Sequence, residues 1–337
     1  MTTLPKILIT GGAGYIGSHA VKLFLSRGYE VVVFDNLSRG YRAAIDILHQ
    51  NGPLTFVQGD LRQPDDLRKL FAEHPGIDAV LHFAALCLVN ESVEQPGLYF
   101  YNNTLGTLNL LEAMRAEAIS TLIFSSTCAV YGNTQYLPVD EQHPTEPASP
   151  YGESKLLTER MIRWYGSIYG LRYAILRYFN VCGAASDGTI GDSKKPSQLM
   201  LQNAVRGALG IEPFSLTCPT VATPDKTPIR DYIDVEDLVV AHLAAYTYLH
   251  QGGSSDTFNL GNGTGYSVKQ IIAKVEAVFQ TQITTANATP RKGEAAQIYA
   301  NPDKARRTLG FTTHKSLEDS ILSLKKWYEG HPHGYQP

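Results

Sequence analysis

Short, nearly continuous apolar segments alternate with longer amphipathic ones through the first half of the chain, and this alternation constrains the fold more than any other feature. The apolar segments are rich in Val, Ile and Phe, as is typical of strands buried on both faces of a sheet. They cover residues 6–10, 30–35, 54–60, 78–85 and 120–126. Helical patterns lie between them, over 17–27, 65–73 and 98–116. Such strand–helix alternation predicts a parallel sheet with helices on both faces.

The later part of the chain is less regular. Two further apolar segments, 171–180 and 257–261, predict a sixth and a seventh strand, whereas 183–196 and 211–228 are rich in turn-forming residues and resemble loops. Amphipathic helices are predicted over 267–279 and 317–328. We therefore predict an α/β protein with a Rossmann-type, doubly wound parallel sheet and a smaller C-terminal α/β substrate-binding domain. The predicted division gives the first domain 1–180 and a return at about 231–261, and the second domain 181–230 and 262–337.

Composition excludes several classes of function. The chain has 337 residues, 43% of them hydrophobic, and a formal net charge of −3, so we expect neither a nucleic-acid nor a membrane partner. The four cysteines are far apart and the ten histidines lack the spacing of metal ligands, so we predict reduced thiols and no metal. The sequence shows no apolar span of transmembrane length and no targeting signal, which predicts a soluble cytoplasmic protein.

The segment ITGGAGYIG, residues 9–17, follows the first predicted strand and opens the first helix. Its glycines have the spacing Gly12-x-Gly14-x-x-Gly17, which allows the backbone to approach a pyrophosphate at a helix N-terminus. A tight turn without a ligand is the alternative, but the order strand, glycines, helix favours a dinucleotide. Asp35 ends the second strand and suits the ribose hydroxyls of NAD, although Arg39 and Arg42 leave NADP open.

Tyr151 and Lys155 lie four residues apart, just after Ser149 and Pro150. Ser is a favoured N-cap and Pro suits the first helical turn, so a helix is predicted to begin here with both side chains on one face. One interpretation is an ordinary pair on a surface helix. The other is a catalytic base, because an ammonium and a nicotinamide cation would lower the phenol pKa from ~10 to ~7. Thr127, at the end of the fifth strand, would contact the reacting hydroxyl.

These motifs resemble those of the NAD-dependent UDP-sugar 4-epimerases of the extended short-chain dehydrogenase/reductase family, and the resemblance covers nearly the whole chain. The matching segments, in order, are TGGAGYIGSH, DNLSRG, GDLR, HFAAL, ESVEQP, NNTLGT, FSSTCAVYG, SPYGESK, LRYFNVCGA, IRDYIDVEDL and FNLGNG. The resemblance implies that NAD is held tightly, oxidises carbon 4 of a UDP-sugar and returns the hydride to the opposite face. UDP-glucose and UDP-galactose are the leading expected substrates, and a UDP-N-acetylhexosamine, a UDP-pentose or UDP-glucuronate is the alternative.

The resemblance also assigns residues to roles. It implies Tyr151 as base, Lys155 as its cationic partner and Thr127 as the hydroxyl at the sugar oxygen. Residues that match the family's cofactor contacts are Gly11, Gly12, Gly14, Tyr15, Ile16, Gly17, Asp35, Asn36, Ser38, Arg39, Gly40, Asp60, Leu61, Phe83, Ala84, Ala85, Cys87, Asn102, Ser125, Tyr151, Lys155, Tyr178 and Phe179. Residues that match its substrate contacts are Thr127, Asn180, Gln198, Leu199, Thr217, Arg230, Arg291, Glu294 and Ile298.

Some of these assignments leave alternatives. Asp60 is predicted either to reach the adenine or to form a turn, and Arg230 and Arg291 either to bind the diphosphate or to form surface ion pairs. Cys87 stands where many relatives have lysine, so cofactor retention is expected to weaken or the pKa of the base to rise, unless the thiol only packs. Gln198 stands where asparagine is common.

The choice of sugar and the reaction class also depend on single positions. Thr217 and its neighbours depart from the family's base-stacking segment, and Ile298 leaves plain hexoses, N-acetylhexosamines and pentoses open. Cys128 and Ala129 follow Thr127 where related dehydratases have an acid, which favours epimerisation. A non-catalytic NAD-binding protein is the alternative from a different class. Helices over 98–116 and 151–169 match those that pair across a dimer in the family, so we predict a homodimer.

Overall fold

The computed structural model describes residues 5–194, 197–287 and 295–335. The chain forms two compact units. Unit 1 consists of Met1–Gly132, Thr145–Arg177 and Val239–Phe258, and unit 2 of Asn133–Pro144, Tyr178–Leu238 and Asn259–Pro337. Unlike the predicted division, 133–144 and 231–238 are grouped with unit 2. The second of these differences arises because a strand at 229–234 pairs within the smaller sheet.

A seven-stranded sheet forms the centre of unit 1, in the order β10-β6-β5-β4-β1-β2-β3. Neighbouring strands among β1 to β5 are parallel, with Leu8 opposite both Val32 and Val80. The predicted fold class is confirmed. The strands are β1 (Lys6–Thr10), β2 (Glu30–Asp35), β3 (Leu54–Gln58), β4 (Ile77–His82), β5 (Thr121–Thr127), β6 (Arg172–Tyr178) and β10 (Asp256–Leu260).

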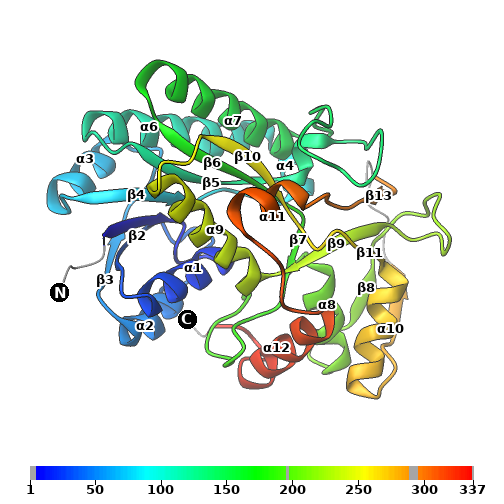
Figure 1. Cartoon of the computed structure of the whole chain (residues 1–337). Coiled ribbons are helices and arrows are strands. Elements are labelled where there is room, and N and C mark those ends of the chain that lie inside the picture. The colour runs from blue at the N-terminus through cyan, green and yellow to red at the C-terminus, as the bar shows by residue number, and fades with distance from the viewer. Residues whose placement is uncertain (1–4, 195–196, 288–294, 336–337) are drawn as a thin grey trace. The chain divides into compact units, whose positions relative to one another are not determined.

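Helices cover both faces of this sheet (Figure 1). On one face a buried cluster joins alternate strand residues such as Leu8 and Val80 to Leu70, Leu110 and Ile162 of three helices. On the other face Phe24 packs against Tyr246. The helices and helical turns are α1 (Tyr15–Ser26), α2 (Arg42–Leu48), η1 (His49–Asn51), α3 (Pro64–Glu73), α4 (Val89–Glu94), α5 (Pro96–Tyr99), η2 (Phe100–Leu105), α6 (Gly106–Ala116), η3 (Cys128–Tyr131), α7 (Pro150–Tyr169) and α9 (Val235–His250).

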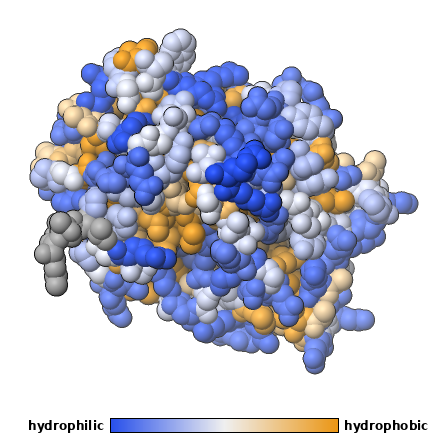
Figure 2. Space-filling view, in the orientation of Figure 1, coloured by the Kyte–Doolittle hydropathy of each residue, from blue (hydrophilic) through white to orange (hydrophobic). Residues whose placement is uncertain are grey.

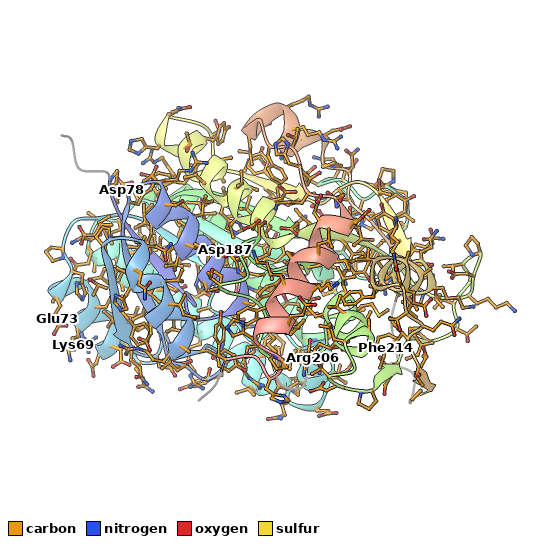
Figure 3. All side chains as sticks on the ribbon, turned by 90° about the horizontal axis from the view of Figure 1, so that it is seen from below. Lys69, Glu73, Asp78, Asp187, Arg206 and Phe214 are labelled. Atoms are coloured by element: carbon orange, nitrogen blue, oxygen red, sulfur yellow. The ribbon has the colours of Figure 1, made fainter. Side chains whose placement is uncertain are left out.

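Unit 2 is built around β9 (Ile229–Asp234), which pairs with β7 (Asn180–Cys182), β11 (Gly265–Ser267) and β13 (Gln297–Ile298). A second, two-stranded sheet joins β8 (Phe214–Leu216) to β12 (Thr285–Asn287). Its helices are α8 (Met200–Ala208), α10 (Val268–Phe279), α11 (Asp303–Leu309) and α12 (Leu317–Gly330). Arg206 of α8 and Phe214 of β8 are labelled in Figure 3.

Three predicted elements differ from the structure. The predicted loop over 211–228 contains β8, because Phe214 to Leu216 find a partner strand some seventy residues further along the chain. The predicted strand over 171–180 is two strands, β6 and β7, which belong to different sheets. The predicted helix over 98–116 consists of α5, a π-helical segment η2 and α6. The first two differences depend on strand pairing between distant segments, which local periodicity does not encode.

The surface in view is mostly hydrophilic, with apolar residues in separate patches (Figure 2). Charged pairs lie on exposed helical turns, as with Lys69 and Glu73 on α3 (Figure 3). Within the part of the chain that the structure describes, no helix combines the length and apolarity needed to cross a membrane.

Candidate active site

The glycine turn between β1 and α1 is closely packed. Gly11 has φ +71°, and a Cβ there would lie 2.5 Å from the backbone nitrogen of Ala84. A Cβ on Gly17 would overlap the carbonyl oxygen of Gly11. Gly14 is the N-cap of α1 and supplies no side-chain cap, so the first turn of the helix begins without one. The turn therefore brings bare backbone to the end of β1, as an anionic ligand would require.

Asp35, the last residue of β2, lies against this turn. Its carboxylate accepts hydrogen bonds from the backbone N–H of Ala13 at 3.1 Å and of Leu37 at 2.8 Å. Burial raises the pKa of Asp35 above its ordinary value, while these two N–H groups oppose the shift. The predicted ribose-binding carboxylate is thus held beside the glycine turn, at the C-terminal edge of the sheet.

Asp60 follows β3 and is bound by its own neighbours. It accepts hydrogen bonds from the backbone and guanidinium of Arg62 and, at 3.0 Å, from the amide of Asn36. The Arg62 hydrogen bonds lower the pKa of Asp60 to about 2. This local pattern favours the turn-forming interpretation of Asp60, and it also joins the segments after β2 and β3.

The segment after β4 is fixed by hydrogen bonds on both sides. The N–H of Phe83 donates to Thr10 at 3.0 Å, and Leu86 exchanges two hydrogen bonds with the side chain of Asn103. His82 lies between the hydroxyls of Thr10 and Thr107. Because burial lowers the pKa of His82 to about 3, its ring is neutral. Phe83, Ala84 and Ala85 therefore follow directly from a strand end whose polar groups are satisfied.

Helix α7 begins as predicted. The Ser149 hydroxyl accepts from the N–H of Gly152 at 3.2 Å, and Pro150 is the first helical residue. Tyr151 and Lys155 are 9% and 4% exposed, so they do not form an ordinary surface pair. The catalytic interpretation requires both side chains to be buried and one helical turn apart, as they are here.

Lys155 is buried over the end of β5. Its ammonium donates to the carbonyl oxygen of Ser125 at 2.8 Å and lies 4.8 Å from the centre of the Phe124 ring. Burial lowers the pKa of Lys155 to about 8, and the neighbouring Cys87 and Glu159 oppose this shift. A cation that has lost much of its hydration acts strongly on any ionisable neighbour.

Thr127 is the last residue of β5 and is 7% exposed. Its hydroxyl oxygen accepts from the N–H of Ala129 at 3.1 Å and so begins η3. Gly152 allows η3 to contact α7 closely, since a Cβ there would lie 2.6 Å from the carbonyl oxygen of Ala129. The turn with Thr127 and the helix with Tyr151 are therefore in direct contact.

Beneath these residues lies a buried ion pair that sequence reasoning did not predict. Glu159, on α7, accepts from Arg177 of β6 at 2.8 and 2.5 Å and from the hydroxyl of Ser126 at 2.6 Å. Arg177 also donates to the hydroxyl of Tyr131 at 3.1 Å. Sequence reasoning also missed other buried polar residues of this region, because their hydrogen bonds appear only in the folded chain. They are Tyr99, Asn103, Ser154 and His242.

The residues predicted to bind the substrate, apart from Thr127, lie in unit 2 or in segments outside the described residues. Asn180 begins β7, Gln198 and Leu199 precede α8, and Thr217 follows β8. Arg230 of β9 is directly opposite Ile298 of β13. Tyr178 ends β6 and Phe179 follows it. The predicted contacts Arg291 and Glu294 lie outside the described residues.

Comparison with known protein families identifies the family of this chain. The model of the NAD dependent epimerase/dehydratase family matches residues 7–261. The chain belongs to this family. The match spans the glycine turn, Asp35 and the Thr127, Tyr151 and Lys155 group.

Individual members of the family are similar over nearly the full length. A UDP-glucose 4-epimerase of Halalkalibacterium halodurans is 42% identical over 331 residues, which cover 98% of this chain and 97% of that protein. UDP-arabinose 4-epimerase 1 of Arabidopsis thaliana is 38% identical, covering 98% of this chain and 80% of that protein. The crystal structure of UDP-glucose 4-epimerase from Bifidobacterium longum in complex with NAD+ and UDP has a TM-score of 0.92 at 34% identity, covering 98% of this chain and all of that one.

Proposed function

We propose that this family member is an NAD-dependent UDP-glucose 4-epimerase, an isomerase that interconverts UDP-glucose and UDP-galactose. The observation that supports this most is the buried pair Tyr151 and Lys155 on α7, in contact with the turn that bears Thr127. The relatives named UDP-glucose 4-epimerase match over the whole length that contains this group.

The residues present fit NAD. The glycine turn leaves backbone and the uncapped start of α1 for a pyrophosphate, and the buried carboxylate of Asp35 suits ribose hydroxyls and repels a 2′-phosphate. Asn36, Ser38, Arg39 and Gly40 extend this surface after β2, and Phe83 to Ala85 after β4. When bound, NAD accepts a hydride from carbon 4 of the sugar and later returns it.

Tyr151 is the proposed general base. It removes the proton from the 4-hydroxyl of the sugar, and Thr127 hydrogen-bonds the same oxygen. Lys155 contributes a desolvated positive charge that favours phenolate over phenol. Its direct hydrogen bond in this structure goes to the Ser125 carbonyl, which orients the ammonium without neutralising it.

The residues after Thr127 limit the chemistry to carbon 4. Cys128 and Ala129 begin η3 and offer no carboxyl group for proton transfer at carbons 5 and 6. A dehydratase needs such a group, whereas an epimerase does not.

Incubation of the purified protein with UDP-galactose tests the proposal. We expect UDP-glucose to accumulate until the two reach equilibrium, and Tyr151→Phe to lower kcat by about 100- to 10,000-fold. Tyr246→Phe, which removes a buried phenol hydroxyl bonded to Asp78 on another part of the sheet, is the matched control. If no UDP-sugar is converted, the proposed function is wrong and a non-catalytic NAD-binding role gains support. If the wild type is active and Tyr151→Phe retains full activity, the role of Tyr151 as general base is wrong.

A UDP-pentose is the second candidate substrate, favoured by the similarity to a UDP-arabinose 4-epimerase. Ile298, predicted to control sugar size, is 6% exposed and lies opposite Arg230 on β9. Comparison of kcat/KM for UDP-galactose, UDP-N-acetylgalactosamine and UDP-arabinose distinguishes these substrates.

We also propose a homodimer formed by helix α7 and the segment before α6. Trp164, Ile168, Tyr169 and Tyr101 are 66, 62, 56 and 51% exposed, an unusual concentration of large apolar side chains for two adjacent helices. A monomer mass in solution would contradict this proposal. The predicted cytoplasmic location remains a prediction, to be checked by cell fractionation.

A further inference from the structure

Tyr99 is a buried tyrosine that none of the proposed steps uses. It ends α5, directly before the π-helical segment η2, and is 0% exposed. Its hydroxyl accepts from the N–H of Leu88 at 3.0 Å and faces two acceptors, the carbonyl of Leu88 at 2.7 Å and a carboxylate oxygen of Glu91 at 2.8 Å. Segments of π-helix are uncommon and occur frequently at functional sites.

The ring of Tyr99 contacts the proposed base. The ring centroids of Tyr99 and Tyr151 are 6.3 Å apart and the planes meet at 79°, an edge-to-face arrangement. Together with Leu86 the two rings form a small buried cluster. The orientation of the Tyr151 ring therefore depends on where the Tyr99 ring is held.

Glu91 extends the contact to the cofactor-binding segment after β2. One of its carboxylate oxygens accepts from Tyr99, and the other forms an ion pair with the guanidinium of Arg39. Arg39 is 52 residues away in the sequence and belongs to the DNLSRG motif. A continuous set of contacts thus runs from Arg39 through Glu91 and Tyr99 to Tyr151.

We propose that Tyr99 and Glu91 are positioning residues that couple the cofactor-binding segment at Arg39 to the orientation of Tyr151. This inference rests on the proposed function, in which Arg39 faces NAD and Tyr151 is the base. A bound cofactor that orders Arg39 then also fixes Glu91, Tyr99 and the ring of the base. Loss of either positioning residue therefore loosens both the segment at Arg39 and the ring of Tyr151.

The alternative, that Tyr99 is itself a base, does not fit its surroundings. Burial and the Glu91 carboxylate raise the pKa of Tyr99 well above its ordinary value, so its hydroxyl stays protonated. That single proton is shared between two acceptors, which makes Tyr99 a fixed donor. A fixed donor suits a positioning role.

Three variants of the full-length protein test the coupling. Tyr99→Phe keeps the ring and removes only the hydroxyl, and Glu91→Gln keeps an acceptor for Tyr99 but removes the ion pair with Arg39. Tyr246→Phe is the control, because its buried hydroxyl donates to Asp78 at 2.9 Å (Asp78 is labelled in Figure 3) and its ring packs against Phe24 and Tyr29. Each protein is measured for NAD retained after gel filtration, for the kcat–pH profile with UDP-galactose, and for its melting temperature.

We expect Tyr99→Phe to lower kcat about 10- to 100-fold with KM changed less than about twofold, and to move the acidic limb of the kcat–pH profile to higher pH. We expect both Tyr99→Phe and Glu91→Gln to release NAD several-fold faster than the wild type, whereas Tyr246→Phe retains NAD normally. The double variant Tyr99→Phe with Glu91→Gln should lose no more activity and NAD retention than the more impaired of the two single variants. Both changes break the same set of contacts, so their effects should not add.

Two results would overturn the inference. In the first, Tyr99→Phe and Glu91→Gln both match Tyr246→Phe in NAD retention and in pH profile. In the second, the effects of the two single changes add independently in the double variant. If Tyr99→Phe does not fold, NAD retention by Glu91→Gln decides, since Glu91 is partly exposed. A wild type that binds NAD but converts no UDP-sugar would disprove the proposed function, while NAD retention would still test the coupling.

Discussion

Two fully buried carboxylates, Glu159 of unit 1 and Asp231 of unit 2, are held in different ways. In unit 1 the carboxylate of Glu159, on α7, is paired with Arg177 of β6, and the ammonium of Lys155 is held by a backbone carbonyl. In unit 2 the carboxylate of Asp231 accepts from the backbone N–H groups of Asn262, Gly263 and Ala300.

This difference follows from what each region has to fix. In the proposed mechanism, proton transfer needs persistent charge near Tyr151, and the ion pair between α7 and β6 holds the helix without neutralising Lys155. The residues of unit 2 that are predicted to bind the substrate lie on loops and strand ends. The hydrogen bonds that Asp231 accepts tie the turn after β10 and the segment after β13 to β9. A salt-bridged pair keeps its charge over a wide pH range, whereas a buried carboxylate held by neutral donors protonates readily.

Breaking the pair in unit 1 should have the largest effect on stability. Arg177→Met removes the buried partner of Glu159 and leaves only its ion pair with Arg163, at 3.0 Å, whose side chain is 39% exposed. This change should lower the free energy of unfolding by about 3–5 kcal/mol. The double variant Arg177→Met with Glu159→Gln should recover much of this loss. Chemical denaturation followed by circular dichroism measures both, and a loss below about 1 kcal/mol for the single variant would show that the pair matters little.

The pH dependence of unit 1 should reveal the buried lysine. Burial lowers the pKa of Lys155 from 10.5 to about 8, so between these pH values the unfolded chain binds a proton that the folded chain has lost, and stability rises with pH. Relative to Lys155→Met, the wild type should gain about 3 kcal/mol from pH 8 to pH 10.5. Denaturation curves at several pH values check this, and parallel pH profiles of the two proteins would contradict it.

In acid, the stability of unit 2 should change with pH in the opposite direction. Burial raises the pKa of Asp231 from 3.8 to about 6, so the folded chain binds the extra proton and stability falls as pH rises from about 4 to 6. We expect a decrease of about 2–3 kcal/mol, which Asp231→Asn should lack. Trp327, buried in unit 2, reports this unfolding by fluorescence once Trp164 is replaced by Phe. An unchanged pH slope in Asp231→Asn would disprove the assignment.

Helix caps should give the smallest effects and separate structure from catalysis. Ser149→Ala removes the cap of α7 and Ser267→Ala that of α10, and each should cost about 1 kcal/mol of stability. Only Ser149→Ala should also lower kcat, because α7 begins with Tyr151. Equal effects of both variants on kcat would show that the start of α7 tolerates movement.

Much of unit 1 was predictable from the sequence because its signals are local. Apolar runs gave the strands from Lys6 to Thr127, the glycines gave the turn before α1, and Ser149 with Pro150 gave the start of α7. Unit 2 was less predictable. Its strands are short, and β8 finds its partner only through a distant segment, so a run of turn-forming residues concealed it.

The sequence by itself determined the alternating α/β architecture, the dinucleotide-binding turn and the Tyr151 and Lys155 pair, because periodicity, glycine spacing and helix caps act within a few residues. The tertiary structure alone decided the pairing of Glu159 with Arg177 and the contacts from Arg39 through Glu91 and Tyr99 to Tyr151. Those partners lie up to 52 residues apart. Which side chains meet over such separations depends on strand order and helix packing, and these exist only in the folded chain.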